Sequence, residues 1–420
     1  MKALFLIDDN LTNRISYYHL MLILVTLPFD QFFSHVILIS FALHTLFTVD
    51  RQKIRAVFTT RNYILQAVFF LTLISLTYTA YPAIAGVDIT RQLVILLFPV
   101  LFSLTSFNIV KYRHHLLLIF SMICVATIAG LYIHAFYIIR YFKLPISALF
   151  SNLFINHKFS NPINMHATFL SLQVAVAFFY LSLLLCSERS LKSRIFLIAA
   201  CILLLTGIVQ LGSKAVLVVI LIGINIVIPY FLIPATKRFK YVLISSALSI
   251  LLVASALSIN SFKTRFVTGL ETDLSNQIVN ESVEPRIVRW QAAMHLVQKR
   301  PIAGYGAGSE LKILGDEYFK EKLYISYLNN LNAHNQYITF LLTTGIIGLL
   351  VYLSTLYFGI KTAVKHRDML FFIFILLIAT VSLSESLLNA EKGVYFYSLF
   401  FSIFVFSNPE KVISRNYLFT

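Results

Sequence analysis

The chain has 420 residues, of which 58% are hydrophobic and only 12% are charged. A soluble domain carries about 25% charged residues, so this composition excludes an ordinary water-facing surface and predicts an all-α integral membrane protein. The formal net charge of +16 does not indicate a nucleic-acid partner, because the basic residues are spread over many loops. The three cysteines form no CxxC pair, so neither a zinc site nor a disulfide framework is predicted.

The membrane-spanning segments begin close to the N-terminus. Asp8 and Asp9 precede the first long apolar run, so we expect no cleavable signal peptide. The first two apolar runs are close-set around Pro28 and Asp30, and one broken helix, giving eleven spans in all, is the alternative to two. Apolar runs separated by charged or turn residues predict about twelve spans, near 16–31, 33–49, 62–80, 89–107, 115–138, 163–185, 195–211, 214–233, 241–258, 334–359, 369–387 and 392–408.

The lysines and arginines of the short loops predict the orientation of these spans. If the N-terminus is cytoplasmic, most of these residues fall in loops on the inner side, as the positive-inside rule requires, and both termini are then cytoplasmic. Three regions follow from this topology. Residues 1–258 form an N-terminal membrane domain of about nine spans, 259–333 form one long periplasmic loop with short helices, and 334–420 form about three spans and a cytoplasmic tail.

The long loop has a nearly neutral, soluble-like composition and contains one clear helix pattern. Pro285 opens this pattern, which runs to about Lys299, because proline is well tolerated at a helix start. Arg286 and Arg289 lie in its first turn. We expect both to lie off an apolar stripe with helical spacing, formed by Ile287, Trp290, Met294 and Val297.

A glycine-rich stretch follows the helix pattern, at Gly304-Tyr305-Gly306-Ala307-Gly308. It resembles a phosphate-binding loop only weakly, since no strand precedes it and no acidic residue follows at the required distance. We therefore interpret it as a turn in which the backbone closely approaches a neighbouring segment.

The loop ends at His334, where the chain re-enters the membrane. Asn332 is a suitable N-cap, so we expect His334 in the first turn of a transmembrane helix at the outer interface. A helix N-terminus disfavours the imidazolium, and a neutral imidazole is what a general base requires. The alternative is an interfacial histidine without a chemical role.

A family pattern surrounds His334. The sequence His334-Asn335, nine residues, Gly345, two residues and Gly348 resembles the motif of the O-antigen ligase and polymerase family of bacterial membrane glycosyltransferases. Upstream, Arg286, Trp290, Pro301 and Gly304-Tyr305-Gly306 look like that family's long periplasmic loop. Glu385-Ser386 is similar to a feature of some members. The resemblance is dense over about 280–395; before that it rests on the order of hydrophobic segments.

The resemblance implies a glycosyltransferase of the inner membrane that acts on its periplasmic face. It would move a glycan from an undecaprenyl diphosphate carrier to an acceptor hydroxyl, with lipid A–core or another glycan as the acceptor. O-antigen ligation is our first choice and O-antigen polymerisation the alternative. No nucleotide sugar, metal or other cofactor is implied. The partners are then the carrier-linked glycan, the acceptor and membrane lipid.

The chemistry assigns roles to the residues that match the motif. His334 is the expected catalytic base, and Arg286, Arg289 and Lys214 are expected to bind the diphosphate, because cations stabilise the charge that develops on the leaving group. The family commonly has a Ser-Arg pair where this sequence has Ser213-Lys214, and lysine keeps the charge without the bidentate geometry. Supporting roles are expected for Ser213, Asn335, Glu385 and His166.

Two of the supporting groups have alternatives of their own. Glu385 lies at membrane depth or its outer edge, where ionisable groups are often functional, and it could orient His334 or pair with Arg286. Asn161, Asn164 and His166 form a polar cluster that could contact sugar hydroxyls or serve as a helix cap.

Other classes of protein fit the sequence less well. A protein glycan ligase with a Ser or Asn acceptor is a third possibility within the family. A transporter or flippase of lipid-linked glycans usually has charged or broken helices near the membrane midplane, whereas these spans are almost free of charge and no internal repeat is evident. A non-enzymatic scaffold is the weakest of the alternatives.

Overall fold

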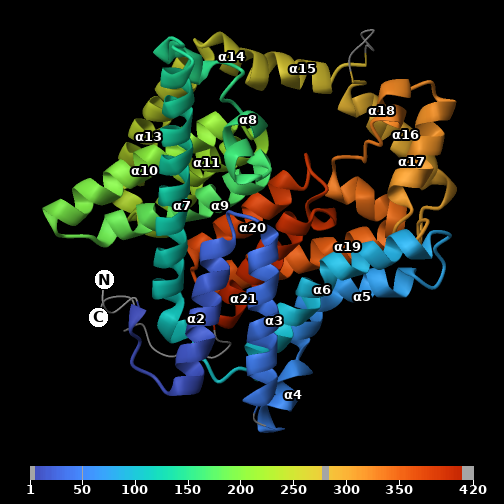
Figure 1. Cartoon of the computed structure of the whole chain (residues 1–420), viewed down its shortest axis with the longest axis horizontal. Coiled ribbons are helices and arrows are strands. Elements are labelled where there is room, and N and C mark those ends of the chain that lie inside the picture. The colour runs from blue at the N-terminus through green and yellow to red at the C-terminus, as the bar shows by residue number, and fades with distance from the viewer. Residues whose placement is uncertain (1–4, 50, 277–282, 409–420) are drawn as a thin grey trace.

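The computed structural model describes residues 5–49, 51–276 and 283–408 of the chain. Every regular element among these residues is a helix, and no strand occurs in them. Figure 1 shows a bundle of long helices with a group of shorter helices, α16 to α18, at one edge. The predicted all-α class is therefore confirmed.

A helix, continuous or interrupted, corresponds to each of the twelve predicted spans. They are α2 (Leu11–Thr26), α3 (Gln31–Phe47), α5 (Thr60–Ser75), α6 (Pro82–Leu104), α7 (Ile109–Tyr141), α9 (Ala167–Ser187), α10 (Leu191–Leu211), α11 (Lys214–Ile222) with η4 (Gly223–Val227) and α12 (Ile228–Leu232), α13 (Ala235–Leu257), α19 (Gln336–Lys365), α20 (Met369–Val381) and α21 (Glu391–Phe406). Short connecting helices are η1 (Arg51–Lys53), α4 (Ile54–Val57), η2 (Ile146–Phe150), α8 (His157–Ser160), η3 (Asn161–Ile163) and η6 (Leu387–Asn389).

Fewer of these helices meet a strict criterion of length and hydropathy. Within the described residues, 7 are long and apolar enough to cross a membrane, namely α6, α7, α9, α10, α11 to α12, α13 and α19. Shorter apolar helices are α3 and α20. These helices identify the chain as an integral membrane protein. The number of twelve spans stays a prediction. The predicted cytoplasmic tail, from 409 onward, lies outside the described residues.

The first two helices are separate, so the alternative of one broken helix is wrong. Asp30 caps α3 by accepting a hydrogen bond from the Phe32 N–H. Hydrogen bonds between the helices pair residues near opposite ends, which shows that they are antiparallel: His44 Nε2 lies 3.1 Å from the Thr12 carbonyl and Thr26 Oγ1 lies 2.9 Å from Ser34 Oγ. The chain therefore reverses direction in the turn at 27–30, beside which Thr26 and Ser34 are joined.

Burial differs strongly among the long helices. Residues 167–181 of α9 and 393–405 of α21 are buried throughout, so these two helices lie at the centre of the bundle. By contrast, Ser245 is the one buried residue of α13, whose apolar side chains face outward. An exposed apolar helix of this length is expected to face lipid.

The long loop contains the short helices that the sequence predicted. The first part holds α14 (Asn260–Lys263), η5 (Thr264–Thr268) and α15 (Gly269–Asp273), and it extends across one end of the bundle towards the second part in Figure 1. The second part holds α16 (Arg286–Lys299), α17 (Glu310–Lys320) and α18 (Tyr324–Leu328), and α16 and α17 share a small apolar core with the start of α19. Residues 277–282 lie outside the described part.

Helix α16 begins after Pro285 and ends at Lys299 as predicted, but the predicted apolar stripe is right only in part, at Trp290 and Val297. The buried face is formed by Arg289, Ala292, Ala293, Leu296 and Val297, so Val297 is buried as predicted, whereas Arg289 is buried although it was expected to lie off the apolar stripe. Met294, assigned to the stripe, is 37% exposed. The alanines face the core because α16 packs closely against α17 and α19, and small side chains permit this approach.

The glycine-rich stretch is a turn with close backbone approach, as predicted. Gly304, Gly306 and Gly308 all have positive φ, and Tyr305 and Gly306 donate backbone hydrogen bonds to Leu342 and Thr343 of α19. The helix is interrupted there by Gly345, with φ 64° and ψ −160°. A Cβ on Gly345 would lie 2.1 Å from the Ile302 carbonyl oxygen. The glycines of the motif therefore join the loop to the break in α19.

Candidate active site

The position of His334 differs from the prediction in one respect. Asn335, not Asn332, is the N-cap of α19, because its side chain accepts hydrogen bonds from Tyr337 N and Ile338 N. His334 therefore precedes the helix rather than occupying its first turn. Its φ of 46° lies in the left-handed region, which is uncommon outside glycine and is frequent at functional sites.

Several elements hold the turn that carries His334. The Trp290 indole of α16 donates to the Ala333 carbonyl at 2.8 Å, and the buried Glu310 carboxylate of α17 accepts from Ala333 N at 3.1 Å. Asn332 Oδ1 accepts from the His334 N–H at 3.0 Å. The strained backbone of His334 is thus fixed on both sides by the long loop and the start of α19.

The imidazole of His334 faces a carboxylate that is distant in sequence. Nδ1 of His334 lies 3.4 Å from Glu385 Oε2, and the two side chains are 33% and 16% exposed. Glu385 was expected within a span over 369–387, but α20 ends at Val381 and Glu385 lies in the loop that follows. Thr168, in the first turn of α9, donates to the other carboxylate oxygen at 3.4 Å. The carboxylate is therefore held between α9 and His334.

Electrostatics keep Glu385 ionised. Burial by itself raises the pKa of this carboxyl, but the hydrogen bond with His334 and the nearby basic groups, among them Arg286, lower it below the usual value. A carboxylate at Nδ1 orients the ring and stabilises the imidazolium that forms when the other nitrogen takes a proton.

Arg286 and Lys214 are brought together by a residue that the sequence analysis did not single out. Asp273, at the end of α15, lies 3.2 Å from Lys214 Nζ and 3.6 Å from Arg286 Nε. Arg286 also donates to the Ser384 carbonyl at 2.8 Å, one residue before Glu385. Both cations are 25% exposed. Ser213, the N-cap residue of α11, is buried beside Lys214.

A third cation, Arg265 of η5, joins this group and was also missed. Its Nε donates to the Gly212 carbonyl at 3.3 Å, two residues before Lys214. The charges of Arg286, Asp273 and Glu385 all act on it, and burial lowers the pKa of its guanidinium. We call Lys214, Arg265 and Arg286 the cation cluster. Residues 259–276 carry no motif that distinguishes Arg265 from the loop's other basic residues, so no pattern in the sequence could have identified it.

Arg289 has different contacts from the cation cluster. It is 4% exposed and donates to the carbonyls of Glu284 at 3.2 Å and Asn332 at 3.5 Å. A guanidinium with these partners joins the segment just before α16 to the end of the long loop. The predicted contact of Arg289 with a diphosphate stays untested.

Two further histidines, His157 and His166, border the pair formed by His334 and Glu385. Their ring centroids lie 4.3 Å apart, and His166 forms the N-cap position of α9. Burial lowers the pKa of His166 to about 4, so this ring is neutral at physiological pH. Asn161 and Asn164, the polar residues predicted with it, line a cavity together with His157 and His166.

Among the described residues, one group has the geometry to hold a metal ion. Single ligand atoms of His295, Glu317 and Glu321 lie within 4.8 Å of one another, on α16, α17 and the residue that follows α17. Lys299 and Lys320 form ion pairs with Glu317, which competes with a metal for the carboxylate. None of these residues belongs to the His334 site.

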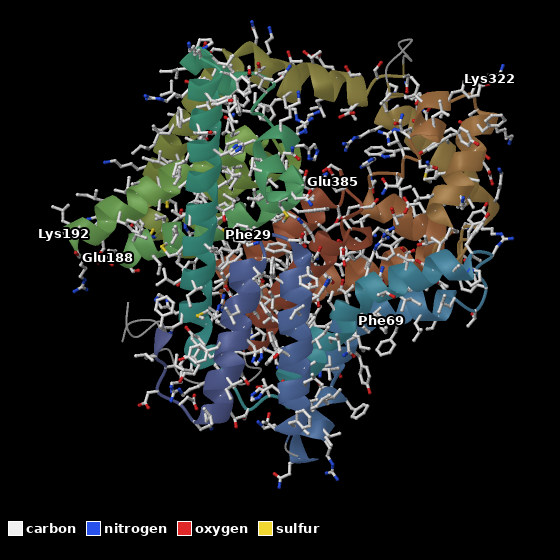
Figure 2. The ribbon with its side chains drawn as sticks, viewed as in Figure 1. Phe29, Phe69, Glu188, Lys192, Lys322 and Glu385 are labelled. Carbon is white, nitrogen blue, oxygen red and sulfur yellow. The ribbon has the colours of Figure 1, made fainter. Side chains whose placement is uncertain are left out.

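The arrangement suits a reaction in which a proton-bearing nucleophile displaces an anionic leaving group. A histidine with a carboxylate behind it can accept a proton, and three cations within one loop-and-helix cluster can stabilise a phosphate or diphosphate. Figure 2 places Glu385 near the middle of the molecule, below the segment that carries α14 and α15.

Comparison with known proteins supports the resemblance. Residues 199–353 match the family model described as O-antigen ligase, which confirms the family suggested by the sequence motif. The match covers Lys214, Arg265, Arg286 and His334, but not Glu385. It indicates an enzyme acting on lipid-linked glycans, with glycosyltransferase activity of the O-antigen ligase or polymerase type. No curated protein matches the chain.

Proposed function

We propose that the chain is a glycosyltransferase that moves a glycan from undecaprenyl diphosphate to an acceptor hydroxyl at the periplasmic face of the inner membrane. O-antigen ligation to lipid A–core is the reaction we favour. The observation that carries this proposal is the pairing of His334 with Glu385 beside the cation cluster. A base and an anion-binding group side by side are the two parts that this transfer needs.

The proposed chemistry assigns a part to each group. Nδ1 of His334 faces Glu385, so Nε2 is the nitrogen that accepts the acceptor's hydroxyl proton. The acceptor oxygen forms a bond to the anomeric carbon while the bond from that carbon to the phosphate oxygen breaks. The diphosphate leaves with the electron pair, and the cation cluster stabilises its charge.

Arg265 lies close to position 214, where this sequence has a lysine. The family commonly has an arginine at the position of Lys214, and lysine lacks a bidentate fork. The side chain of Arg265 reaches the backbone of Gly212 beside it, as its 3.3 Å hydrogen bond shows. We propose that Arg265 supplies the guanidinium that position 214 lacks. A diphosphate bound by these cations would take the place of the Asp273 carboxylate, which lies near both Lys214 and Arg286.

Deletion and complementation in the native host test this function. Deletion of the gene should leave lipid A–core undecorated, with long carrier-linked glycan accumulating, if the enzyme is a ligase. Decoration with a single repeat would instead indicate a polymerase. Complementation with His334→Ala is expected to lower transfer by about 10²- to 10⁴-fold, the contribution of a general base. Arg286→Ala should lower it by about 10²-fold or more.

Matched controls separate this mechanism from a general effect of mutating the outer loop. His295→Ala and Arg300→Ala change exposed residues of the same loop outside the site, and they should complement the deletion. Wild-type glycan attachment in both His334→Ala and Arg286→Ala would contradict the mechanism. Purified protein with carrier-linked glycan, lipid A–core and a chelator tests whether the reaction is metal-independent, as we propose.

A further inference from the structure

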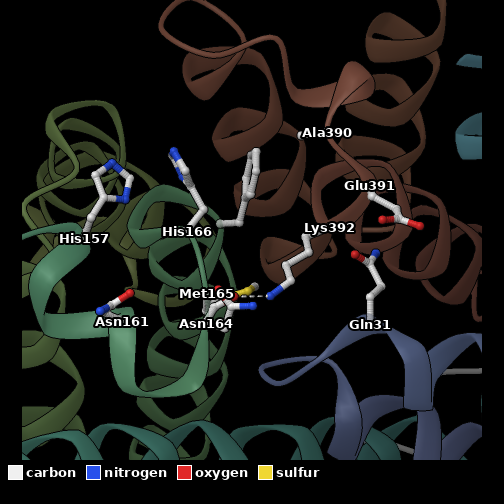
Figure 3. A pocket seen from close by; sticks show the side chains of 10 residues that line it. Gln31, His157, Asn161, Asn164, Met165, His166, Ala390, Glu391 and Lys392 are labelled. Atoms are coloured by element: carbon white, nitrogen blue, oxygen red, sulfur yellow. Dashed lines mark hydrogen bonds between the residues drawn. The ribbon is translucent and has the colours of Figure 1, made fainter. Parts of the chain in front are cut away.

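A cavity of about 440 Å³ adjoins the site and has no part in the chemistry above. Its two ends differ, as Figure 3 shows. His157 and His166 line one end, while Gln31 of α3 and Glu391 of α21 line the other. The cavity is therefore built from three separate parts of the chain, and only its histidine end belongs to the surroundings of Glu385.

The histidine end connects the cavity to the proposed reaction centre. The charges of Glu385 and His334 both act on His166, and Arg265 and Glu385 act on His157. Among the described residues, Nδ1 of His166 is buried without a hydrogen-bond partner. A buried polar atom without a partner is unfavourable, so a ligand hydroxyl at this position would satisfy it.

The lining of the cavity indicates the chemistry of its ligand. The side-chain amides of Gln31 and Asn161 offer donors and acceptors without charge. The cavity contains one lysine, Lys392, whose Nζ already donates to the Asn164 carbonyl at 2.6 Å. Glu391 adds a carboxylate that would repel a phosphate. These groups suit the hydroxyls of a neutral sugar and not a diphosphate.

The geometry of the displacement indicates that the two substrates bind on different sides of the reacting carbon. The attacking oxygen must approach the anomeric carbon from the side opposite the leaving diphosphate. The diphosphate is assigned to the cation cluster on α11, η5 and α16, and the far end of the cavity lies on α3 and α21, which carry none of these cations. We propose that this cavity binds the neutral sugar that bears the acceptor hydroxyl. This inference rests on the proposed function.

Kinetics with the purified full-length protein test the proposal. Gln31→Ala and Asn161→Ala should each raise KM for lipid A–core about 3- to 10-fold, the effect of one lost neutral hydrogen bond, while KM for the undecaprenyl-linked donor changes less than about 2-fold. Asn329→Ala removes an exposed asparagine of the outer loop outside the cavity and should change neither constant. An unchanged KM for lipid A–core in both cavity variants would overturn the proposal.

A labelling experiment tests the cavity without requiring turnover. In a Cys186→Ser background, which removes the exposed native cysteine, Asn161→Cys is reacted with a maleimide. Core oligosaccharide released from lipid A by mild acid, or the neutral glycan repeat released from its carrier, should slow this labelling at least 3-fold. Undecaprenyl diphosphate should not. Lys312→Cys, on exposed α17 surface, should label equally with every probe.

The two experiments keep the two proposals apart. A wild-type protein that transfers no glycan contradicts the proposed function, and the labelling result still decides whether the cavity binds a neutral sugar. Labelling of Asn161→Cys that neither glycan slows, or that undecaprenyl diphosphate alone slows, would overturn the assignment of the cavity even in an active transferase.

Discussion

At the scale of single residues, Glu385 is the side chain that makes His334 more than an interfacial histidine. Because the pKa of Glu385 lies below its usual value, the carboxylate stays charged throughout the neutral range. Glu385→Gln keeps a hydrogen-bond acceptor but removes the charge that stabilises the imidazolium. We expect kcat to fall at least about 100-fold, with KM for the carrier substrate unchanged.

The control for this substitution is Asp316→Asn, which removes an exposed acidic charge from α17 of the same loop and should leave kcat unaltered. Transfer assays on the purified variants measure both constants. A Glu385→Gln enzyme with wild-type kcat would show that the pair of His334 and Glu385 has no catalytic role.

For Asp273 we predict that a substitution improves binding of the carrier substrate. Its carboxylate lies between Lys214 and Arg286, so an incoming diphosphate must displace it. Asp273→Asn removes the competing charge, and we expect KM for the carrier substrate to fall about 3- to 10-fold, more at low ionic strength than at high. A raised KM would show instead that Asp273 organises the cation cluster for binding.

Glu310 is the residue through which pH should affect the stability of the site. Burial raises the pKa of Glu310 to about 7, although its hydrogen bonds with Ala333 N and Thr339 oppose the shift. A raised pKa means that the folded protein binds the proton more tightly than the unfolded chain. The resulting stability is present below the usual carboxyl pKa and is lost as pH rises through about 7.

Thermal unfolding in detergent between pH 5.5 and pH 8 measures this effect. The wild type should lose about 2 kcal/mol of stability over this range from Glu310 alone. Glu310→Gln, which is neutral at every pH, should show a correspondingly flatter dependence. Parallel curves for the two proteins would contradict the buried, proton-binding state of Glu310.

At the scale of elements, the join between the long loop and α19 depends on glycine. Gly345→Ala would place a Cβ 2.1 Å from the Ile302 carbonyl oxygen, at a φ of 64° that L side chains rarely adopt. The neighbour is backbone and cannot give way cheaply. We expect a loss of at least about 3 kcal/mol and a lower thermal midpoint. Gly130→Ala, in α7 with nothing within 4 Å, should be neutral or slightly stabilising.

The elements also show which parts of the site a sequence can predict. The motif around His334, the helix from Arg286 and the turn at Gly304–Gly308 were predictable because local residue types determine them. The cap at Asn335 was misassigned because two asparagines, at 332 and 335, compete for that position. Arg265 and Asp273 were missed because their role depends on contacts of the loop with Gly212 and Lys214 at the start of α11. His157 was missed because its role depends on its contact with His166, and neither kind of contact leaves a periodic pattern.

At the scale of the whole molecule, the same contrast appears in the helices. Apolar runs and turn residues predicted a helix in each of twelve places, since a span must satisfy its own backbone hydrogen bonds. Burial was not predictable in this way: α9 and α13 are similarly apolar, yet α9 is buried over residues 167–181 and α13 has one buried residue, Ser245. That difference comes from packing partners that hydropathy does not encode.

The orientation in the membrane is a prediction about the whole molecule that depends on its loops and on the basic residues in them. In Figure 2, Glu188 and Lys192 lie at one edge of the molecule and Lys322, at the end of α17, lies at the opposite edge. The positive-inside rule assigns the connection between α9 and α10 to the cytoplasm, because it is short and basic. Three predicted spans, α10, α11 to α12 and α13, separate that connection from the loop with α17, so we predict that this loop is periplasmic, on the same side as His334 and the cation cluster.

Single cysteines in the Cys186→Ser background test this orientation in cells. A membrane-impermeant maleimide should label Lys312→Cys in intact spheroplasts but label Lys192→Cys only after permeabilisation. A reversed pattern would place the pair of His334 and Glu385 on the cytoplasmic side. Transfer to an acceptor exposed at the periplasmic surface would then be impossible, whatever the chemistry of the site, so this result bears on the function as directly as any active-site variant.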